Sequence, residues 1–138
     1  MVLRSHEDRR GVAAAELAIL LPFLMFIFLI TVDWARIAYF TLTVHNCARN
    51  GAMFASDSYS TTKSPYINMS QAALADAPNL SPAPTVKPLR MGVDASGRTY
   101  VECTVEYHFR TVTSYPGIPN DTLISRTVRM FKAPQVPN

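Results

Sequence analysis

The chain has 138 residues, enough for one small globular unit once about twenty of them are assigned to a membrane crossing. The net charge of +3 is small, and the basic residues are scattered rather than gathered on one face with interleaved aromatic residues. Nucleic acid is therefore not expected as a partner. The two cysteines are far apart and lack a CxxC or Cys/His grouping, so no zinc site is indicated.

The first predicted element is a transmembrane helix. Residues 12–32 carry a single charge, that of Glu16, and a helix of this length reaches roughly 30 Å, the hydrocarbon thickness of a bilayer. Pro22 is compatible with this assignment, because membrane helices tolerate proline as a kink. The run also lacks the small-residue exit of a cleaved secretory signal peptide. We expect one crossing.

Basic residues before the span set its orientation. Arg4, Arg9 and Arg10 precede the apolar run, and positive residues near the end of a span favour the cytoplasmic side. Residues 1–11 are therefore expected to form a cytoplasmic leader. Residues 33–138 should lie beyond the inner membrane, on its periplasmic or extracellular side.

Glu16 is the unusual residue of the span. A carboxylate in the apolar part of a membrane helix costs roughly 2–3 kcal/mol, so a neutralising partner is expected. A cut after Gly11 would turn Val12 into a free amine, four residues before Glu16 on the same helical face. The alternative is an interfacial carboxylate that reaches the lipid headgroups. The spacing from Gly11 to Glu16, between arginines and an apolar run, favours processing.

The helical pattern continues beyond the span. Apolar and small residues recur at steps of four and three, which predicts one helix to about Ala55 and makes residues 33–55 its exposed extension. Gly51 within this pattern indicates either close packing against a neighbour or the start of fraying. The recurring positions are Ile30, Trp34, Ile37, Thr41, Val44, Ala48, Gly51 and Ala55.

The outer membrane boundary is expected near Asp33, Trp34 and Arg36. Asp33 and Arg36 can form an i,i+3 ion pair worth about 0.2–0.5 kcal/mol, and a solvated start of the exposed helix explains them better than a specific site. Trp34 and Tyr39 fit an interfacial aromatic belt.

Residues 56–138 are expected to form an extracytoplasmic domain. Residues 56–66 are rich in turn formers and predict a loop. The stretch "SQAALADA", residues 70–77, predicts a short second helix with Ser70 as its N-cap and Pro78 as its stop. A proline-rich connection comes next, and the alternation over residues 89–93 before "DASG" predicts the first arm of a hairpin.

The second arm carries the clearest strand pattern. Residues 101–109 alternate apolar and polar, which predicts one buried and one wet face. Residues 113–121 predict a loop, and residues 123–131 a third strand with Ile124, Val128 and Met130 inward, although Arg126 breaks the alternation. The predicted fold is α+β: a long N-terminal helix, a short second helix and a three-stranded antiparallel sheet packed on the long helix.

Cys47 and Cys103 have two interpretations. Cys103 belongs to the inward set of its strand, and Cys47 lies on the helix expected to cover that face. A disulfide could form if their α-carbons come within about 7 Å. Two buried free thiols are the alternative.

No pattern for catalysis is found. His6, His45 and His108 are isolated in three segments, and neither an HExxH motif nor a GxSxG motif occurs. Glu102 and Glu106 share a strand face about 13 Å apart, too far for paired acid–base work. We therefore expect no enzyme activity, no catalytic residue, no cofactor and no metal.

Two stretches carry a family resemblance. "RRGVAAAE" before the apolar run resembles the processing motif of type IV pilin-like proteins. The phrase "VDWARIAYFTLTVHNCARNGAMFAS" resembles the segment after the span in TadE-like proteins, the minor pseudopilins of tight-adherence (Flp-type) pilus systems. The resemblance is strongest from Arg9 to about Ser56. Leu17 departs from it, since the family often has an aromatic residue there.

This resemblance implies a function. It implies cleavage by a prepilin peptidase after Gly11, and assembly through the N-terminal helix with a major pilin, a companion pseudopilin and the platform and motor proteins of the pilus. It also implies a role in cell adhesion, biofilm formation and secretion. One rival is a single-pass anchored binding module of another envelope complex, which would keep residues 1–11. The other rival, a membrane-tethered hydrolase, lacks a nucleophile and base.

Overall fold

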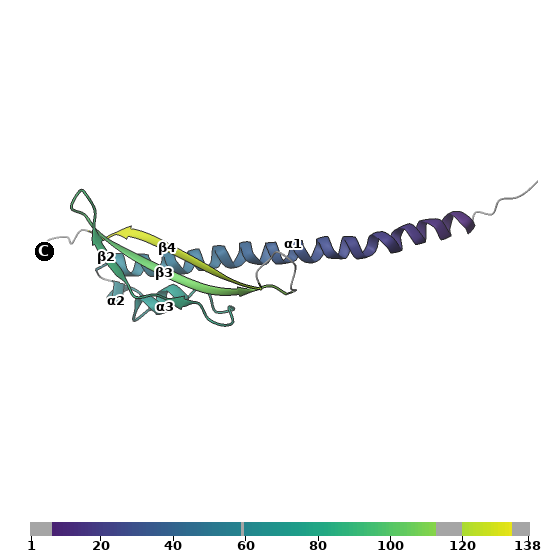
Figure 1. Ribbon diagram of the computed structural model, residues 1–138. Helices are drawn as coiled ribbons and strands as arrows, with labels where there is room; N and C mark the ends of the chain where they lie inside the picture. Colours follow the sequence, from purple (N-terminus) through teal and green to yellow (C-terminus); the bar gives the residue numbers. More distant parts are fainter. Residues whose placement is uncertain (1–6, 59, 113–119, 134–138) are drawn as a thin grey trace, which may run out of the picture. The chain divides into compact units, whose positions relative to one another are not determined.

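The computed structural model describes residues 7–58, 60–112 and 120–133, with side chains described from Gly11 on (Figure 1). The chain divides into two compact units, residues 1–36 and 37–138, which are considered separately. The helix α1, Glu7–Ser56, contributes to both. Its end at Ser56 agrees with the expected end at about Ala55, whereas its start at Glu7 precedes Val12.

In the first unit, α1 is an unbroken helix that contains Pro22. Every side chain from Gly11 to Phe28 is exposed. The segment lacks the polar face of an ordinary surface helix, since residues 17–30 contain no polar side chain. A helix that is apolar all round is typical of a buried core or a membrane span.

In the second unit, an antiparallel sheet is built around β3, Thr99–Arg110. The strand β4, Asp121–Phe131, pairs with β3 in one continuous register from Tyr100↔Phe131 to Arg110↔Asp121. The strands β1, Thr85–Val86, and β2, Arg90–Val93, pair with other parts of β3. The described residues thus form a four-stranded sheet (Figure 1).

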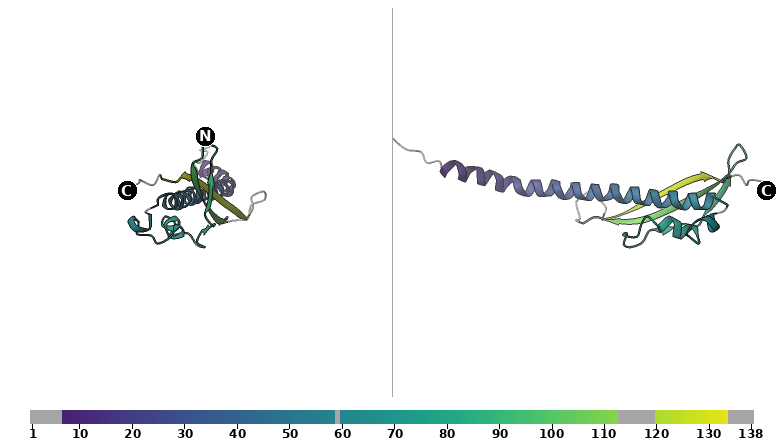
Figure 2. Two further views of the ribbon diagram at one scale, coloured as in Figure 1. Left: turned by 90° about the vertical axis from the view of Figure 1, so that its left-hand side faces the viewer. Right: turned by 180° about the vertical axis from the view of Figure 1, so that it is seen from behind.

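The core lies between one face of this sheet and the last turns of α1, which cross β3 and β4 in Figure 2, right. The predicted alternation of β3 is confirmed, because its odd-numbered side chains from Val101 to Phe109 are all buried. The helix contributes small side chains, which allow close approach to the sheet. The buried helix residues of this core are Val44, Cys47, Ala48 and Ala52.

Gly51 is a point of close approach between α1 and β3. A Cβ atom added there would come within 3.1 Å of the Cβ of Ala73 and within 3.5 Å of the Cβ of Cys103. Of the two readings of Gly51, close packing is therefore the correct one, and the neighbour belongs to the same chain. The helix α3, Met69–Leu74, carries Ala73 into this contact.

The structure corrects several expected boundaries. The sheet has a fourth short strand, β1, inside the proline-rich connection, where it pairs through Thr85↔Glu106 and Val86↔Val105. The expected loop 56–66 contains one helical turn, α2, Ser60–Lys63. The helix α3 starts before Ser70, because Asn68 is the N-cap and its side chain accepts a hydrogen bond from the Gln71 N–H at 2.9 Å.

The last strand, β4, agrees more closely with the strand predicted from the sequence. Ile124 is buried, and Val128 and Met130 pack partly buried against the core, as expected. Arg126 occupies an inward position of the register but is exposed, which shows that the core does not cover this part of β4. Residues 113–119 of the expected loop lie outside the described residues, and Asp121 already belongs to β4.

Candidate functional site: the apolar helix and the domain that follows it

The apolar part of α1 is the first candidate functional surface. Large side chains such as Leu17, Ile19 and Phe23 are more than half exposed in the folded chain. Because burying one such side chain is worth about 1.5–3 kcal/mol, a run of them cannot remain in contact with water. The helix from Gly11 to Ser56 is long and apolar enough to cross a membrane, and the apolar window is not covered by the described chain.

Gly11 lies inside α1 rather than at its end. A Cβ atom added there would meet nothing within 4 Å, and its backbone does not adopt positive φ. Glycine in a helix interior is destabilising by about 1 kcal/mol relative to alanine. Nothing in the fold of the described residues therefore requires a glycine at this position.

Val12 and Glu16 both lie on the exposed surface of α1. Their separation of four residues places them one turn apart on one side of the helix. Among the side chains that the structure describes, no ion pair or hydrogen bond of Glu16 is found. The Glu16 carboxylate thus follows Val12 by one helical turn.

Asp33 and Arg36 form the i,i+3 ion pair at 3.0 Å. Asp33 is only 2% exposed, so the expectation of a solvated helix start does not hold for its carboxylate. Trp34, between them in sequence, is exposed. An exposed indole ring beside an ion pair is compatible with a position at the boundary between lipid and water.

Cys47 and Cys103 are both fully buried in the core of the second unit, where both are free thiols. Burial, with smaller contributions from Asp76 and Cys103, raises the pKa of Cys47 to about 11. Burial also raises the pKa of Cys103. Nucleophilic cysteines are thiolates near neutral pH, so these thiols have the opposite character.

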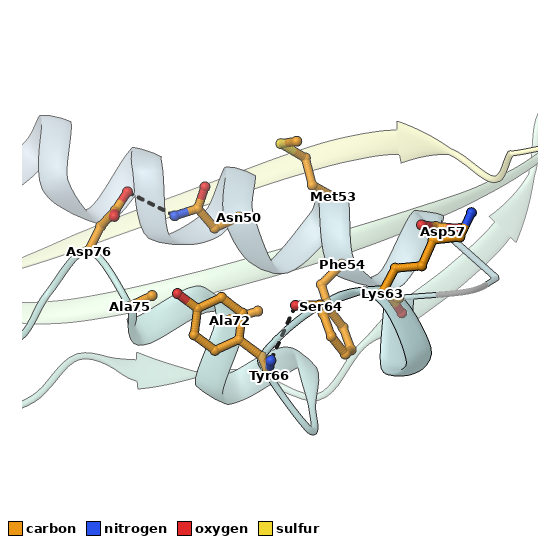
Figure 3. A pocket seen from close by; sticks show the side chains of 11 residues that line it. Asn50, Met53, Phe54, Asp57, Lys63, Ser64, Tyr66, Ala72, Ala75 and Asp76 are labelled. Carbon is orange, nitrogen blue, oxygen red and sulfur yellow. Dashed lines mark hydrogen bonds between the residues drawn. The ribbon is translucent and has the colours of Figure 1, made fainter.

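A pocket of about 440 Å³ lies between the end of α1, α2 and α3 (Figure 3). Met53, Phe54 and Tyr66 give it apolar surface, and Lys63 is also among its lining residues. Asn50 donates a hydrogen bond of 2.8 Å to Asp76 across one end. No histidine or cysteine occurs among its described lining residues. Sequence reasoning missed it, because its walls come from three separate segments.

Several further titratable groups form ion pairs on the wet face of the sheet. Arg129 lies 2.6 Å from Glu102, and Lys87 lies 2.9 Å from Glu106. His108 contacts Asp121 at 3.3 Å, with both side chains more than half exposed. Within the described residues no group of three metal-ligating side chains is found. These ion pairs make this face hydrophilic and connect neighbouring segments of the sheet.

The described residues define a class of protein: one apolar N-terminal helix, long enough to cross a membrane, that continues into a small α+β domain. Comparison with known families gives a match over part of the chain. A family model described as TadE-like protein matches residues 11–53, from Gly11 to three residues before the end of α1. Neither the curated proteins nor the solved structures gave a match.

The chain is thus similar to TadE-like proteins over most of α1, and the resemblance seen in the sequence is confirmed over residues 11–53. The matched helix contains Gly11, Glu16, the ion pair at Asp33 and the close contact at Gly51. The rest of the second unit lies outside the match. The family and the apolar helix together fit a membrane-anchored, pilus-associated protein.

Proposed function

We propose that the chain is a minor pseudopilin of a tight-adherence pilus, cleaved after Gly11 by a prepilin peptidase and assembled through α1. One observation carries the proposal: the TadE-like match covers the helix whose apolar side chains are exposed in the described chain. Such a surface needs lipid or the helices of other subunits around it. The protein is structural, and its partners are the major pilin, a companion pseudopilin and the platform and motor proteins.

Gly11 supports the cleavage step. The fold gives no steric or conformational reason for a glycine there, although glycine weakens a helix. Recognition by a peptidase gives such a reason, because a residue without a side chain lets an enzyme approach the peptide bond closely. The scissile bond would be that between Gly11 and Val12.

Glu16 supports the assembly step. Cleavage would leave a positive amine on Val12, one helical turn from the Glu16 carboxylate. In lipid, a charge without a partner is strongly unfavourable, so the pair would form within one subunit or between neighbours. This pairing would set the register of packed helices. Residues 1–11 would lie in the cytoplasm and the α+β domain on the outer side of the inner membrane.

The decisive experiment is the intact mass of the membrane-extracted full-length chain, carrying a C-terminal tag, in cells with and without an active prepilin peptidase. We expect a chain that begins at Val12 only when the peptidase is active. Gly11→Val should block the cut, whereas the matched change Ala35→Val in the same helix should not. A chain that keeps its leader beside a working peptidase would instead support a single-pass anchored binding module.

A further inference from the structure

A groove of about 570 Å³ lies on the wet face of the sheet. Thr104 and Glu106 line it, and these are even-numbered residues of β3, whereas the core covers the odd-numbered ones. The groove belongs to the second unit alone, so it is present whether or not α1 is cleaved. Its volume falls within the range of about 300–1,000 Å³ that is typical of small-molecule sites.

A bulge in the strand beside β3 forms this groove. β4 pairs along one edge of β3, so β1 and β2 share the other edge. β1 ends at the partner of Val105, and β2 begins at the partner of Glu102. Three residues, 87–89, therefore lie opposite two residues of β3. Pro88 has no N–H with which to continue the ladder, and a bulge bends its strand and redirects side chains.

Arg90 is the cation of the groove that the fold leaves available. Its partner in the strand register is Glu102, but Glu102 forms its ion pair with Arg129, at 2.6 Å. Among the described residues Arg90 has neither an ion pair nor a hydrogen bond, and its side chain is exposed. The planar N–H fork of a guanidinium matches the two oxygens of a carboxylate. Arg90 is therefore placed to bind a carboxylate that enters the groove.

The groove also offers hydrogen-bonding groups of both kinds. The hydroxyls of Thr104 and Thr127 lie 2.8 Å apart, and because their contact uses only one of the two hydrogens, one O–H can still donate to a ligand. Lys87 lies 2.9 Å from Oε2 of Glu106, which leaves Oε1 able to accept. Donors and acceptors beside a guanidinium suit a ring that carries both hydroxyls and a carboxylate.

The charge of the groove separates this ligand from others. Its lining has two positive side chains, Lys87 and Arg90, and one negative side chain, Glu106. Nucleic acids and polyphosphates need many cations, which this lining does not supply. Peptide partners are usually anchored by large side chains in apolar pockets, but the apolar residues of the described lining are Pro88 and Leu89. One net positive charge matches a ligand with one carboxylate per ring.

We propose that this groove binds a uronic acid unit of an acidic polysaccharide. The carboxylate of the sugar pairs with Arg90, its hydroxyls bond to the threonine pair and to Glu106, and the apolar face of the ring packs on Leu89. Arg90, Pro88 and Thr127 are exposed, so a sugar within a polymer can reach the groove. This binding is separate from the assembly of α1 and does not depend on cleavage after Gly11.

The test is isothermal titration calorimetry on the full-length chain in a non-ionic detergent. The probe is trigalacturonic acid, and its neutral match is galactotriose of the same linkage, in which a CH₂OH group replaces each carboxylate. We expect the acidic sugar to bind at least about tenfold more tightly, because a charge-assisted hydrogen bond to Arg90 is made only by the carboxylate. Equal affinities for the two sugars would overturn the proposal.

Variants locate the binding site. Arg90→Gln should weaken binding of trigalacturonic acid by at least about tenfold. The matched control Arg110→Gln removes an exposed arginine from the other end of the same face of β3 and should leave the affinity unchanged. Thr127→Val removes one hydroxyl and keeps the shape of the side chain, so it should weaken binding of both sugars several-fold.

Two further outcomes would contradict the assignment. Equal losses for Arg90→Gln and Arg110→Gln would show that the acidic sugar binds through general charge rather than in the groove. A triglutamate peptide presents carboxylates without ring hydroxyls, and binding of this peptide as tight as that of trigalacturonic acid would assign the groove to an acidic protein segment instead. Should Arg90→Gln fail to fold by circular dichroism, the comparison of the two sugars on the unchanged chain still decides.

Discussion

The Sγ atom of Cys103 on β3 lies 2.6 Å from the position that a Cβ atom on Gly51 of α1 would occupy. This sulfur therefore fills the space that the glycine leaves open. The contact is part of the core of the second unit, where Cys103 is fully buried. The fit between a missing side chain and a sulfur fixes how closely the helix approaches the sheet.

Gly51→Ala should destabilise the domain despite the better helix propensity of alanine. The propensity gain is at most about 1 kcal/mol, whereas overpacking a tight core costs about 1–3 kcal/mol. Here the added carbon meets a buried sulfur and the Cβ of Ala73 at 3.1 Å. We expect a lower midpoint of thermal unfolding for the detergent-solubilised full-length chain, followed by circular dichroism.

A double-mutant cycle isolates this contact. Cys103→Ala removes the sulfur, so Gly51→Ala should cost less in that background than in the wild type. Ala38→Gly is a useful control, since Ala38 is exposed on the same helix and tests propensity alone. Equal costs of Gly51→Ala in both backgrounds would show that the sulfur is not the obstacle.

The stability of the domain should fall as the pH rises from about 9 to about 11. In the unfolded chain Cys47 ionises near its ordinary pKa of 9.0, but in the folded chain burial raises that pKa to about 11. The stabilising contribution is complete below the unfolded pKa and is lost as the pH passes through the folded one. Thermal unfolding between pH 8 and pH 11 measures it.

Cys47→Ala is the control for this pH dependence. Tyrosines and lysines also titrate in this range, so the thiol contribution is the difference in slope between the wild type and the variant. We expect the variant to lose stability less steeply. A slope identical to that of the wild type would mean that Cys47 is equally able to ionise in the folded domain.

Phe109→Ala should cost about 3–5 kcal/mol in the free energy of unfolding. Phe109 is 1% exposed, and its ring centroid lies 5.5 Å from that of Phe40 on α1, so truncation opens a cavity between helix and sheet. Val93→Ala, on the exposed surface of β2, should change stability by less than about 0.5 kcal/mol. Chemical denaturation of both variants gives the comparison, and similar losses for the two would contradict the burial difference.

Asp94 should hold the hairpin turn between β2 and β3 closed. Its carboxylate accepts hydrogen bonds from the hydroxyl and N–H of Ser96 and from the N–H of Arg98, and these contacts lower its pKa. The stabilisation is present above the ordinary pKa of 3.8 and is lost as the pH falls through the lower, folded value. Asp94→Ala should therefore speed amide exchange of Ser96 and Arg98 at neutral pH, while that of Val105 in mid-strand should stay slow.

Glu16→Gln should leave cleavage intact and weaken assembly. The amide keeps the shape of the side chain but removes the charge that would pair with the Val12 amine. We expect the mass of the extracted chain to be unchanged apart from the substitution, and the amount that co-purifies with sheared pili to fall several-fold. Glu106→Gln, a similar change on the wet face of β3, should not affect either measurement.

Much of the fold is encoded in local sequence patterns. The alternation from Val101 to Phe109 is long enough to specify both the strand and its buried face. The spacing of apolar residues predicts the helix through Ala55, because the period persists over many turns. The sequence of α1 also contains the candidate processing site, whose residues are close neighbours along one helix.

The features that could not be predicted depend on contacts between distant segments. β1 has only two residues and is a strand because the edge of β3 is available to it. Ser70 is a good N-cap by residue type, but Asn68 lies earlier in the chain and makes the bond to Gln71. The identity of the residue that packs on Gly51, and the pocket beside Asn50, likewise require the tertiary structure.

The hydrogen bond between Ala133 and Ser56 joins the end of the sheet to the end of α1. The chain leaves α1 at Ser56 and contacts the same residue again at Ala133. The two ends of the domain therefore lie together. The TadE-like match stops at residue 53, just before this junction. The domain after Ser56 therefore lies outside the matched segment, although both of its ends are attached to the end of that helix.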